Sequence, residues 1–554
     1  MKPHQLELLS QPSFGLSRRT FLRGSAFTAL ALAAGLVPQR AVGLAPTPIP
    51  FSLGIASGDP THDSVVLWTR LATDPLNGGG MPHVPNEVKW KIATDPQLRH
   101  VVRRGTFIAH PDDGHSVHVA VNGLAPDRWY WYQFESGRDL SPVGRTRTFP
   151  EPGSKPRLMR FAFVSCQHFE AGFYTAWEHL AQEDLDFVVH LGDYIYEGGA
   201  SASGVRQHLP VSEIMTLEDY RNRYAQYRSD ANLQSAHALF PFIVTWDDHE
   251  VENNYAGDVS ENNGDADPTN NVPAAEFRAR RARAYKAYFE HMPLDPRLRL
   301  KGAGAQLFRR FDWGRLAQFH VLDTRQFRSD QPCGGAKDLL APAGDDLVIS
   351  CGEEFNPSAT LTGAEQEKWL LAGLRHSKSR WNVIAQQVMM TAVDFGPGLA
   401  RFDPRVAGLQ IRNVDAWDGY VAARNRLLGS VLDKEIANLV VLSGDIHSSW
   451  VADLKPDFAD PASPTVGTEF VGTSITSDFS PEFIPIIEGA LLDPANAHVK
   501  FFDGASHGYV RCSVTPERWR SDYRVVDTVL LPTATVRTLK SFIVQDGRAG
   551  SLVA

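Results

Sequence analysis

Five short polar segments carry the side chains that could bind metal ions or transfer protons. Each follows a run of apolar residues, where a buried strand would end: Ser165-Cys166-Gln167, Gly192-Asp193-Tyr194-Ile195-Tyr196-Glu197, Trp246-Asp247-Asp248-His249-Glu250-Val251-Glu252-Asn253, Leu322-Asp323-Thr324-Arg325 and Ser443-Gly444-Asp445-Ile446-His447. Layered α/β domains place their functional sites at such strand ends. Buried charged groups are costly unless they are paired or bound to a metal ion. A single segment is equally well explained as a helix cap or a satisfied polar group, but the five together favour a shared metal centre.

Other nucleophile chemistries fit the sequence less well. A tyrosine-phosphatase thiol at Cys166 would need an arginine six residues later, and position 172 is glycine. His249-Glu250 would open a zinc-protease His-Glu-x-x-His motif, but the closing position is Asn253. The sequence also lacks a phosphate-binding P-loop.

Strands and helices alternate in the part of the chain that carries these segments. Continuous apolar runs predict strands at 158–165, 187–193, 242–246, 316–322, 381–385 and 437–443, and helices are expected near 174–180, 276–290, 362–374 and 418–434. Strands that are apolar throughout are typical of sheets covered on both faces, so the pattern predicts a layered α/β domain. Asp418 is interpreted as the cap of the last helix; the alternative is that Trp417 and Tyr420 line a pocket.

The preceding residues show a different pattern. Short β-like runs at 64–69, 87–92, 116–121 and 129–134 are separated by turn residues, which predicts a small antiparallel β-sandwich. The Pro- and Gly-rich stretch 150–156 is a linker candidate. We therefore expect a β-sandwich domain at 46–152 and a catalytic domain at 153–554.

The N-terminal residues are expected to direct export. Ser17-Arg18-Arg19-Thr20-Phe21-Leu22 precedes an uncharged, apolar stretch at 24–38 that is too short to span a bilayer comfortably. The paired arginines resemble a twin-arginine signal, so residues 1–45 are expected to engage the Tat export machinery and be removed, leaving a periplasmic or secreted protein without a transmembrane helix. The alternative is a disordered basic N-terminus.

Composition limits the class of protein. The chain has 554 residues, of which 43% are hydrophobic and 21% charged, with a net charge of −9. These values exclude a disordered chain and a polytopic membrane protein, and they give no electrostatic case for a nucleic-acid surface.

The motifs SCQ, GDYIYE, TWDDHEVENN, LDTRQFR and LSGDIHSSW resemble those of the PhoD-like alkaline phosphatase and phosphodiesterase family, a branch of the two-metal phosphoesterases. The resemblance covers nearly all of the chain after the signal. It implies a metallophosphoesterase four-layer α/β/β/α sandwich, preceded by a small immunoglobulin- or fibronectin-like antiparallel β-sandwich. It also implies a centre with Fe3+ and one or two Ca2+ ions.

The resemblance assigns ligands to both kinds of ion. Cys166, Asp193, Tyr196 and His447 would hold iron, and Asp248 and Asp445 would face calcium, with Asn253 as a weaker candidate. Related two-metal phosphatases have an aspartate at the first position and a Gly-His-x-His motif at the last, where this chain has Cys166 and Gly444-Asp445-Ile446-His447. Thiolate and phenolate suit Fe3+, and a carboxylate-rich second site favours calcium over zinc.

The implied activity is hydrolysis of phosphate esters by a metal-activated hydroxide, best at alkaline pH. Arg325 would hold a phosphate oxygen bidentately; the alternative is a salt bridge with Asp323 or Asp330. His249 would stabilise the phosphate or protonate the leaving group, and a purely structural role is the alternative.

Two other functions remain open. One is a non-catalytic extracellular binding module, and the other is a phospholipase D-like or teichoic-acid phosphodiesterase that uses the same site. The preference for monoesters or diesters also stays open.

The remaining cysteines have simpler expected roles. Cys333 and Cys351 flank a Pro- and Gly-rich insertion and could pair in an oxidising compartment, and the sequence leaves this open. Cys512 is expected to be a buried core thiol.

Overall fold

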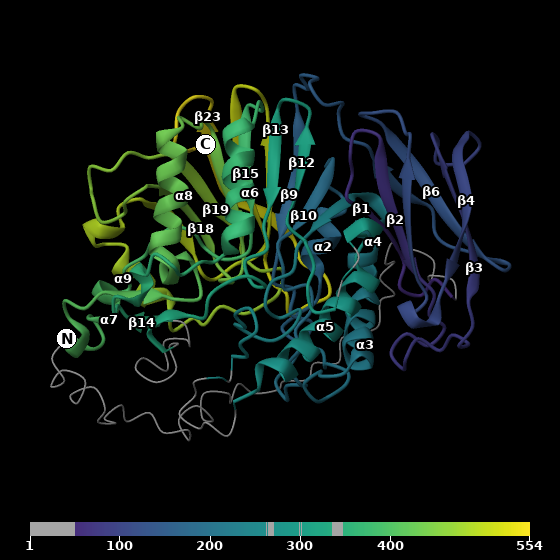
Figure 1. Ribbon diagram of the computed structural model, residues 1–554, viewed down its shortest axis with the longest axis horizontal. Coiled ribbons are helices and arrows are strands. Elements are labelled where there is room, and N and C mark those ends of the chain that lie inside the picture. Colours follow the sequence, from purple (N-terminus) through teal and green to yellow (C-terminus); the bar gives the residue numbers. More distant parts are fainter. Residues whose placement is uncertain (1–49, 262, 264–270, 299, 301, 335–346) are drawn as a thin grey trace, which may run out of the picture.

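The computed structural model describes residues 50–261, 263, 271–298, 300, 302–334 and 347–554 (Figure 1). The predicted export signal at 1–45 lies outside these residues. Among the described residues, no helix is both long enough and apolar enough to cross a membrane.

A ten-stranded sheet forms one half of the central structure. Its strands, in order across the sheet, are β24 (Ser551–Val553), β23 (Val536–Gln545), β22 (Arg518–Val526), β21 (His507–Val514), β9 (Met159–Val164), β10 (Phe187–His190), β11 (Pro241–Val244), β1 (Ile55–Gly58), β2 (Ser64–Arg70) and β5 (Ser116–Asn122). Strands β9, β10, β11 and β1 pair in parallel. Their carboxyl ends therefore lie at one edge of the sheet.

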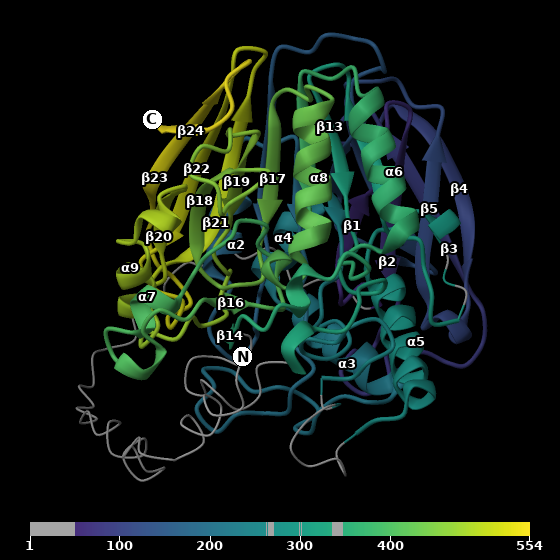
Figure 2. The same ribbon diagram turned by 60° about the vertical axis from the view of Figure 1, so that its left-hand side comes forward.

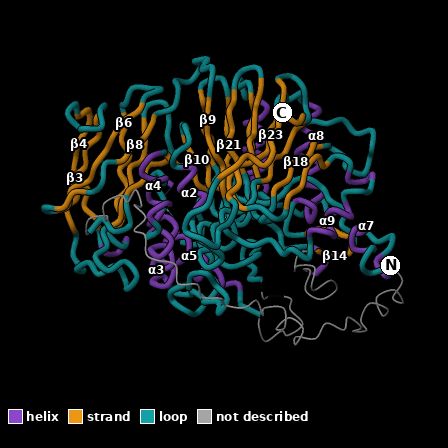
Figure 3. Tube along the Cα trace, turned by 180° about the vertical axis from the view of Figure 1, so that it is seen from behind, coloured by secondary structure: helices purple, strands orange, loops and turns teal. Residues whose placement is uncertain are grey.

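A seven-stranded sheet forms the other half. Its order is β12 (Arg309–Trp313), β13 (Ala317–Val321), β15 (Trp381–Ala385), β17 (Leu439–Ser443), β19 (Gly467–Val471), β18 (Ser449–Leu454) and β20 (Val499–Asp503). Strands β13, β15, β17 and β19 are parallel. Seen from behind in Figure 3, the strands of both sheets run into a common region of loops.

The two sheets pack face to face because successive side chains of a strand point to opposite faces. In β9, Phe161 and Phe163 belong to the core between the sheets, whereas Ala162 and Val164 face the outer helices. In β17, Val440 and Leu442 face the first sheet, and Val441 faces the helices on the other side. This double burial explains why the strands are apolar throughout.

Helices cover both outer faces, which confirms the expected four-layer α/β/β/α arrangement (Figure 2). On the first sheet these are α2 (Thr175–Leu180), α3 (Leu217–Arg228), α4 (Ala231–Leu239) and α5 (Ala274–His291); on the second they are α6 (Gly363–His376) and α8 (Val421–Asp433).

The expected N-terminal β-sandwich is also present. A second antiparallel sheet contains β4 (Val101–Ala109), β3 (Asn86–Ala93), β6 (Trp129–Ser136), β7 (Asp139–Leu140) and β8 (Gly144–Arg147). Its buried residues Val88 and Ile92 share a core with Val65 and Val117 of β2 and β5. Because β1 pairs with both β2 and β11, the sandwich is continuous with the ten-stranded sheet.

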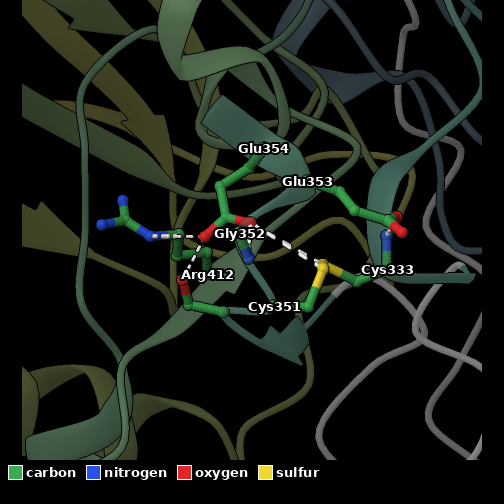
Figure 4. Close-up of a disulfide and its surroundings, with 7 residues drawn as sticks. Cys333, Cys351, Gly352, Glu353, Glu354 and Arg412 are labelled. Carbon is green, nitrogen blue, oxygen red and sulfur yellow. Dashed lines mark hydrogen bonds and ion pairs between the residues drawn. A yellow bond between two sulfur atoms is a disulfide. The ribbon is translucent and has the colours of Figure 1, made fainter. Parts of the chain in front are cut away.

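Cys333 and Cys351 form a disulfide bond, whereas Cys166 and Cys512 are free and buried. The disulfide joins the segment after Arg325 to the residues after β14 (Leu347–Ile349), and β14 pairs with β16 (Ile411–Asn413). Figure 4 shows Glu354 between the disulfide and Arg412, and Gly352 N donates to Glu354 Oε2 at 2.8 Å.

Candidate metal centre

The polar segments meet where the parallel strands of both sheets end. Cys166 N donates to Gly192 O at 3.2 Å, which joins the segments after β9 and β10. Four residues here have left-handed backbones, with φ of 57° at Cys166, 56° at Asp193, 67° at Asp445 and 54° at His447. Non-glycine residues adopt this conformation uncommonly, and it is concentrated at functional sites.

The first cluster contains Cys166, Asp193 and His447, whose potential ligand atoms all lie within 4.8 Å of one another. The Tyr196 hydroxyl donates to Asp193 Oδ2 at 2.8 Å and lies 3.1 Å from His447 Nε2. His447 Nδ1 donates to Asp478 O at 2.9 Å, which leaves Nε2 facing the cluster. The structure therefore brings together the four predicted iron ligands.

The second cluster contains three carboxylates. The closest oxygens of Asp247, Asp248 and Asp445 lie within 4.8 Å of one another, and ligand atoms of Asp193, Asp248 and His249 do so as well. Asp193 belongs to a group with Cys166 and to a group with Asp248, so it connects the two clusters. This is the position expected of a ligand shared by two metal ions.

The electrostatics of the site fit bound cations. Burial raises the pKa of Asp193 and Asp445 well above their usual values. The neighbouring Asp248 carboxylate adds to both shifts. Asp193 Oδ1 and Asp248 Oδ1 are buried without a hydrogen-bond partner. A buried acceptor without a donor is uncommon, and a metal ion would satisfy both oxygens. The donor set therefore fits a metal cofactor.

Burial also raises the pKa of the Cys166 thiol and the Tyr196 phenol well above their usual values, with the Asp193 carboxylate adding to both shifts. Burial lowers the pKa of His447 to about 4, so its imidazole is neutral and able to bind a metal ion. The thiol and phenol would ionise only against strong positive charge, which a trivalent ion supplies.

His249 forms a close pair with Glu197. Its Nδ1 lies 2.7 Å from Glu197 Oε2, and its ring centroid lies 4.1 Å from that of Tyr196. Burial alone would lower the pKa of His249, but the carboxylates of Glu197, Asp248 and Asp193 raise it well above its usual value. These carboxylates therefore favour the protonated imidazole, which is the form that an acid or a phosphate-binding group needs.

Arg325 is placed differently from the prediction. Its side chain is 0% exposed, and its Nη1 and Nη2 donate to Asp415 Oδ1 at 2.8 Å and to Asp445 Oδ1 at 3.0 Å. Its Nε donates to Asp247, and Asp248 Oδ1 lies 3.5 Å from Nη2. The guanidinium thus offsets the negative charge of these carboxylates. Each of its nitrogens already faces a carboxylate oxygen, which leaves little capacity for the predicted phosphate contact. Of the two alternative partners, Asp323 accepts a hydrogen bond from the Arg325 backbone at 3.1 Å.

Asn253 lies on the pocket next to the centre. Its Nδ2 donates to Glu261 Oε2 at 2.6 Å, and its backbone donates to Glu197 Oε1 at 2.7 Å. A role of its amide oxygen as a ligand stays a prediction.

Sequence reasoning missed several supporting residues. Glu250 accepts the backbone N–H groups of Asp193 at 3.1 Å, Tyr194 at 2.6 Å and Asp247 at 2.7 Å, and thereby joins the loops after β10 and β11. Ser477 donates to the Tyr196 hydroxyl at 2.7 Å. Glu250 stands inside a recognised motif, but only the folded chain reveals its three donors.

The expected helix cap is wrong. Helix α8 begins at Val421 after a short 3-10 helix, Trp417–Tyr420, and no side chain caps it. Asp418 instead accepts from Val393 N at 2.9 Å and from Arg424 Nη1 at 2.6 Å. Trp417 and Tyr420 are buried in the core.

A pocket of about 270 Å³ opens beside the two clusters. One side is formed by Asp193, Asp248, His249, Asp445 and His447. The other side carries apolar side chains from β14, from α9 (Ile484–Ala490) and from the residues that precede α7 (Gly396–Leu399) and α9, together with the polar residues Asn413, Asp478 and Ser480. This volume suits a small ligand that contacts both sides.

Comparison with known proteins agrees with this geometry. The sequence model described as PhoD-like phosphatase matches residues 161–523, and that described as the PhoD-like phosphatase N-terminal domain matches residues 38–150. The protein named alkaline phosphatase D from Bacillus subtilis (strain 168) is 47% identical over 545 residues, which cover 96% of this chain and 88% of that protein. The solved structure titled "Structure of PhoD" is 47% identical, covers 91% of this chain and 92% of its own, and superposes with a TM-score of 0.83.

Proposed function

The chain belongs to the PhoD-like phosphatase family and is a phosphoesterase, and we propose that it hydrolyses phosphomonoesters, phosphodiesters or both at an iron–calcium centre. One observation carries the proposal: a thiol, a phenol, an imidazole and several carboxylates from four strand ends converge on Asp193. Such a mixed donor set would have little use in a module that only binds.

The two clusters support different metal ions. Cys166, Asp193, Tyr196 and His447 would hold Fe3+, since thiolate and phenolate prefer a trivalent ion. Asp248 and Asp445, with Asp193 and Asn253, would hold one or two Ca2+ ions, since calcium takes several oxygen ligands. When bound, these ions neutralise phosphate charge and lower the pKa of water, which is the chemistry that hydrolysis of a phosphate ester requires.

The side chains around the clusters bind the ester and move the proton. His249, held by Glu197 at 2.7 Å, would donate its Nε2 proton to the leaving oxygen or stabilise a phosphate oxygen. Arg325 would keep the calcium-binding carboxylates apart and ionised. Glu250 would hold the two ligand-bearing loops at a constant separation.

We also propose that the enzyme acts outside the cytoplasm, in the periplasm or after secretion, and works best at alkaline pH. The twin-arginine pattern at Ser17-Arg18-Arg19 supports export, with residues 1–45 as the signal. We propose that residues 46–152 form the N-terminal domain and residues 153–554 the catalytic domain.

Hydrolysis assays with parallel metal analysis test the proposal. The iron- and calcium-loaded protein should hydrolyse p-nitrophenyl phosphate, its bis ester or both, show a visible tyrosinate-to-iron absorption band, and lose turnover with a chelator. Cys166→Ala should lose the band and most of the activity, whereas Cys512→Ala, a matched buried thiol on β21, should keep both. No turnover of either ester by the metal-loaded protein would refute the proposal.

A further inference from the structure

The pocket beside the metal centre is apolar on one side. We call this side the aromatic wall and define it as Leu347, Phe395, Phe479, Phe483 and Ile487, all of which line the pocket. They come from β14, from the residue before α7, from the loop after β19, and from the start and body of α9. Figures 1 and 2 both place β14, α7 and α9 together beyond one end of the strands.

Phe479 of the aromatic wall packs against other aromatic side chains. The Phe479 ring lies 6.3 Å from that of Phe483 and 6.1 Å from that of Phe502, measured between centroids. A Cβ built at Gly504 would lie 2.9 Å from Cδ1 of Phe479, so the backbone of residue 504 supports this ring directly. A ring that is already packed loses less side-chain entropy when a ligand binds than a free ring does.

The wall is also joined to the metal centre. Asp478 O accepts the Nδ1 proton of His447 at 2.9 Å, and Phe479 is the next residue. Ile446, which lies between Asp445 and His447, lines the same pocket. A phosphate group held by the predicted ligands would therefore have its organic group directed into a space bounded by the wall.

We propose that Phe479 and Phe483 bind the organic group of the phosphate ester, and that the site favours esters with an aromatic or other apolar group on the phosphate. The inference rests on the proposed function. The five side chains of the wall are hydrocarbon, so they stabilise an apolar group by removing it from water and an aromatic ring by ring contacts as well.

Binding and kinetics with paired probes test this inference. Calorimetry on the metal-loaded protein compares phenylphosphonate with methylphosphonate, which share the phosphonate group and differ in the organic group. Phe483→Ala and Phe479→Ala should each weaken phenylphosphonate binding about tenfold and leave methylphosphonate binding unchanged. For p-nitrophenyl phosphate, KM should rise about tenfold with kcat within about twofold, because the wall contributes equally to substrate and transition-state binding.

Three controls make the result decisive. Phe402→Ala removes a phenylalanine that is 56% exposed and does not line the pocket, and it should change nothing. Phe483→Leu keeps an apolar side chain and should give an intermediate affinity, while thermal unfolding shows that each variant is folded. Equal phenylphosphonate affinity in folded wild-type, Phe483→Ala and Phe479→Ala proteins would overturn the inference. Wall-dependent binding without any turnover would instead refute the proposed function and leave the inference standing.

Discussion

Asp193 takes part in both metal-binding clusters, and its backbone is held by Glu250. The sequence indicated Asp193, Cys166, Tyr196 and His447 because their types and motifs suggested metal ligands. It did not indicate Glu250, whose role depends on three N–H donors from two separate loops. A residue that acts through tertiary hydrogen bonds carries no local signal of that role.

Replacing Glu250 by glutamine should loosen both loops. The glutamine amide would place an N–H group against a backbone N–H, so we expect the free energy of unfolding to fall by about 1–3 kcal/mol and metal affinity to fall with it. Urea unfolding and metal titration measure the two effects. Glu135→Gln, which affects only an exposed 3.1 Å pair with Lys89, should be nearly neutral. Equal stability of the two variants would contradict this role.

Arg325→Met should destabilise the metal-free protein strongly. The substitution leaves Asp247 and Asp445 buried without their cation, whereas Asp415 keeps Arg328, and removing one partner of a buried ion pair costs about 3–5 kcal/mol. Denaturant unfolding of the metal-free protein measures it. Arg426→Met, at an exposed pair with Glu367, should cost less than about 1 kcal/mol. A loss below 1 kcal/mol for Arg325→Met would show that the cluster does not need this charge.

At the scale of elements, the parallel strands were the most predictable part. Runs such as 437–443 are apolar because β17 is covered by the first sheet on one face and by helices on the other. The start of α8 was not predictable, because Asp418 binds Val393 N and Arg424 instead of capping the helix. Local sequence shows that a capping residue is present, and tertiary contacts decide whether it caps.

The disulfide should stabilise the element that carries Leu347 of the aromatic wall. It closes a sequence separation of 18 residues, for which the chain-entropy argument gives about 3 kcal/mol. Cys333→Ser/Cys351→Ser should therefore lower the melting temperature, and wild-type protein in reductant should melt at the same lower temperature. Reductant should lower the melting temperature of Cys512→Ser by the same amount as that of the wild type, because Cys512 is not part of the disulfide. Equal melting temperatures of the oxidised wild type and the double variant would contradict the stabilising role.

At the scale of the whole molecule, the N-terminal sandwich and the catalytic sheets form one hydrogen-bonded structure. Strand β1 pairs with β11, Trp68 Nε1 donates to Glu290 O at 3.0 Å, and His118 Nε2 lies 2.9 Å from Met292 O. Apolar runs and turn spacing predicted both parts of the fold, the layered α/β domain and the N-terminal sandwich. They could not predict this continuity, because the pairing of strands from distant segments depends on the folded arrangement.

A fragment of residues 153–554 should therefore fail to fold independently. It would lack β1, β2 and β5, and β11 would become an exposed edge with unpaired backbone groups that favours aggregation. Size-exclusion chromatography and thermal unfolding, with a chain of residues 46–554 as the control, measure this. A monomeric fragment with a cooperative transition would contradict it.

The most direct test of the central claim is the metal content of wild-type protein and of Asp193→Asn, measured by elemental analysis after parallel purification. Because Asp193 contributes to both clusters, the wild type should carry iron and calcium, and the variant should lose both. A folded Asp193→Asn protein that retained iron and calcium at wild-type levels would contradict a metal centre built on this residue.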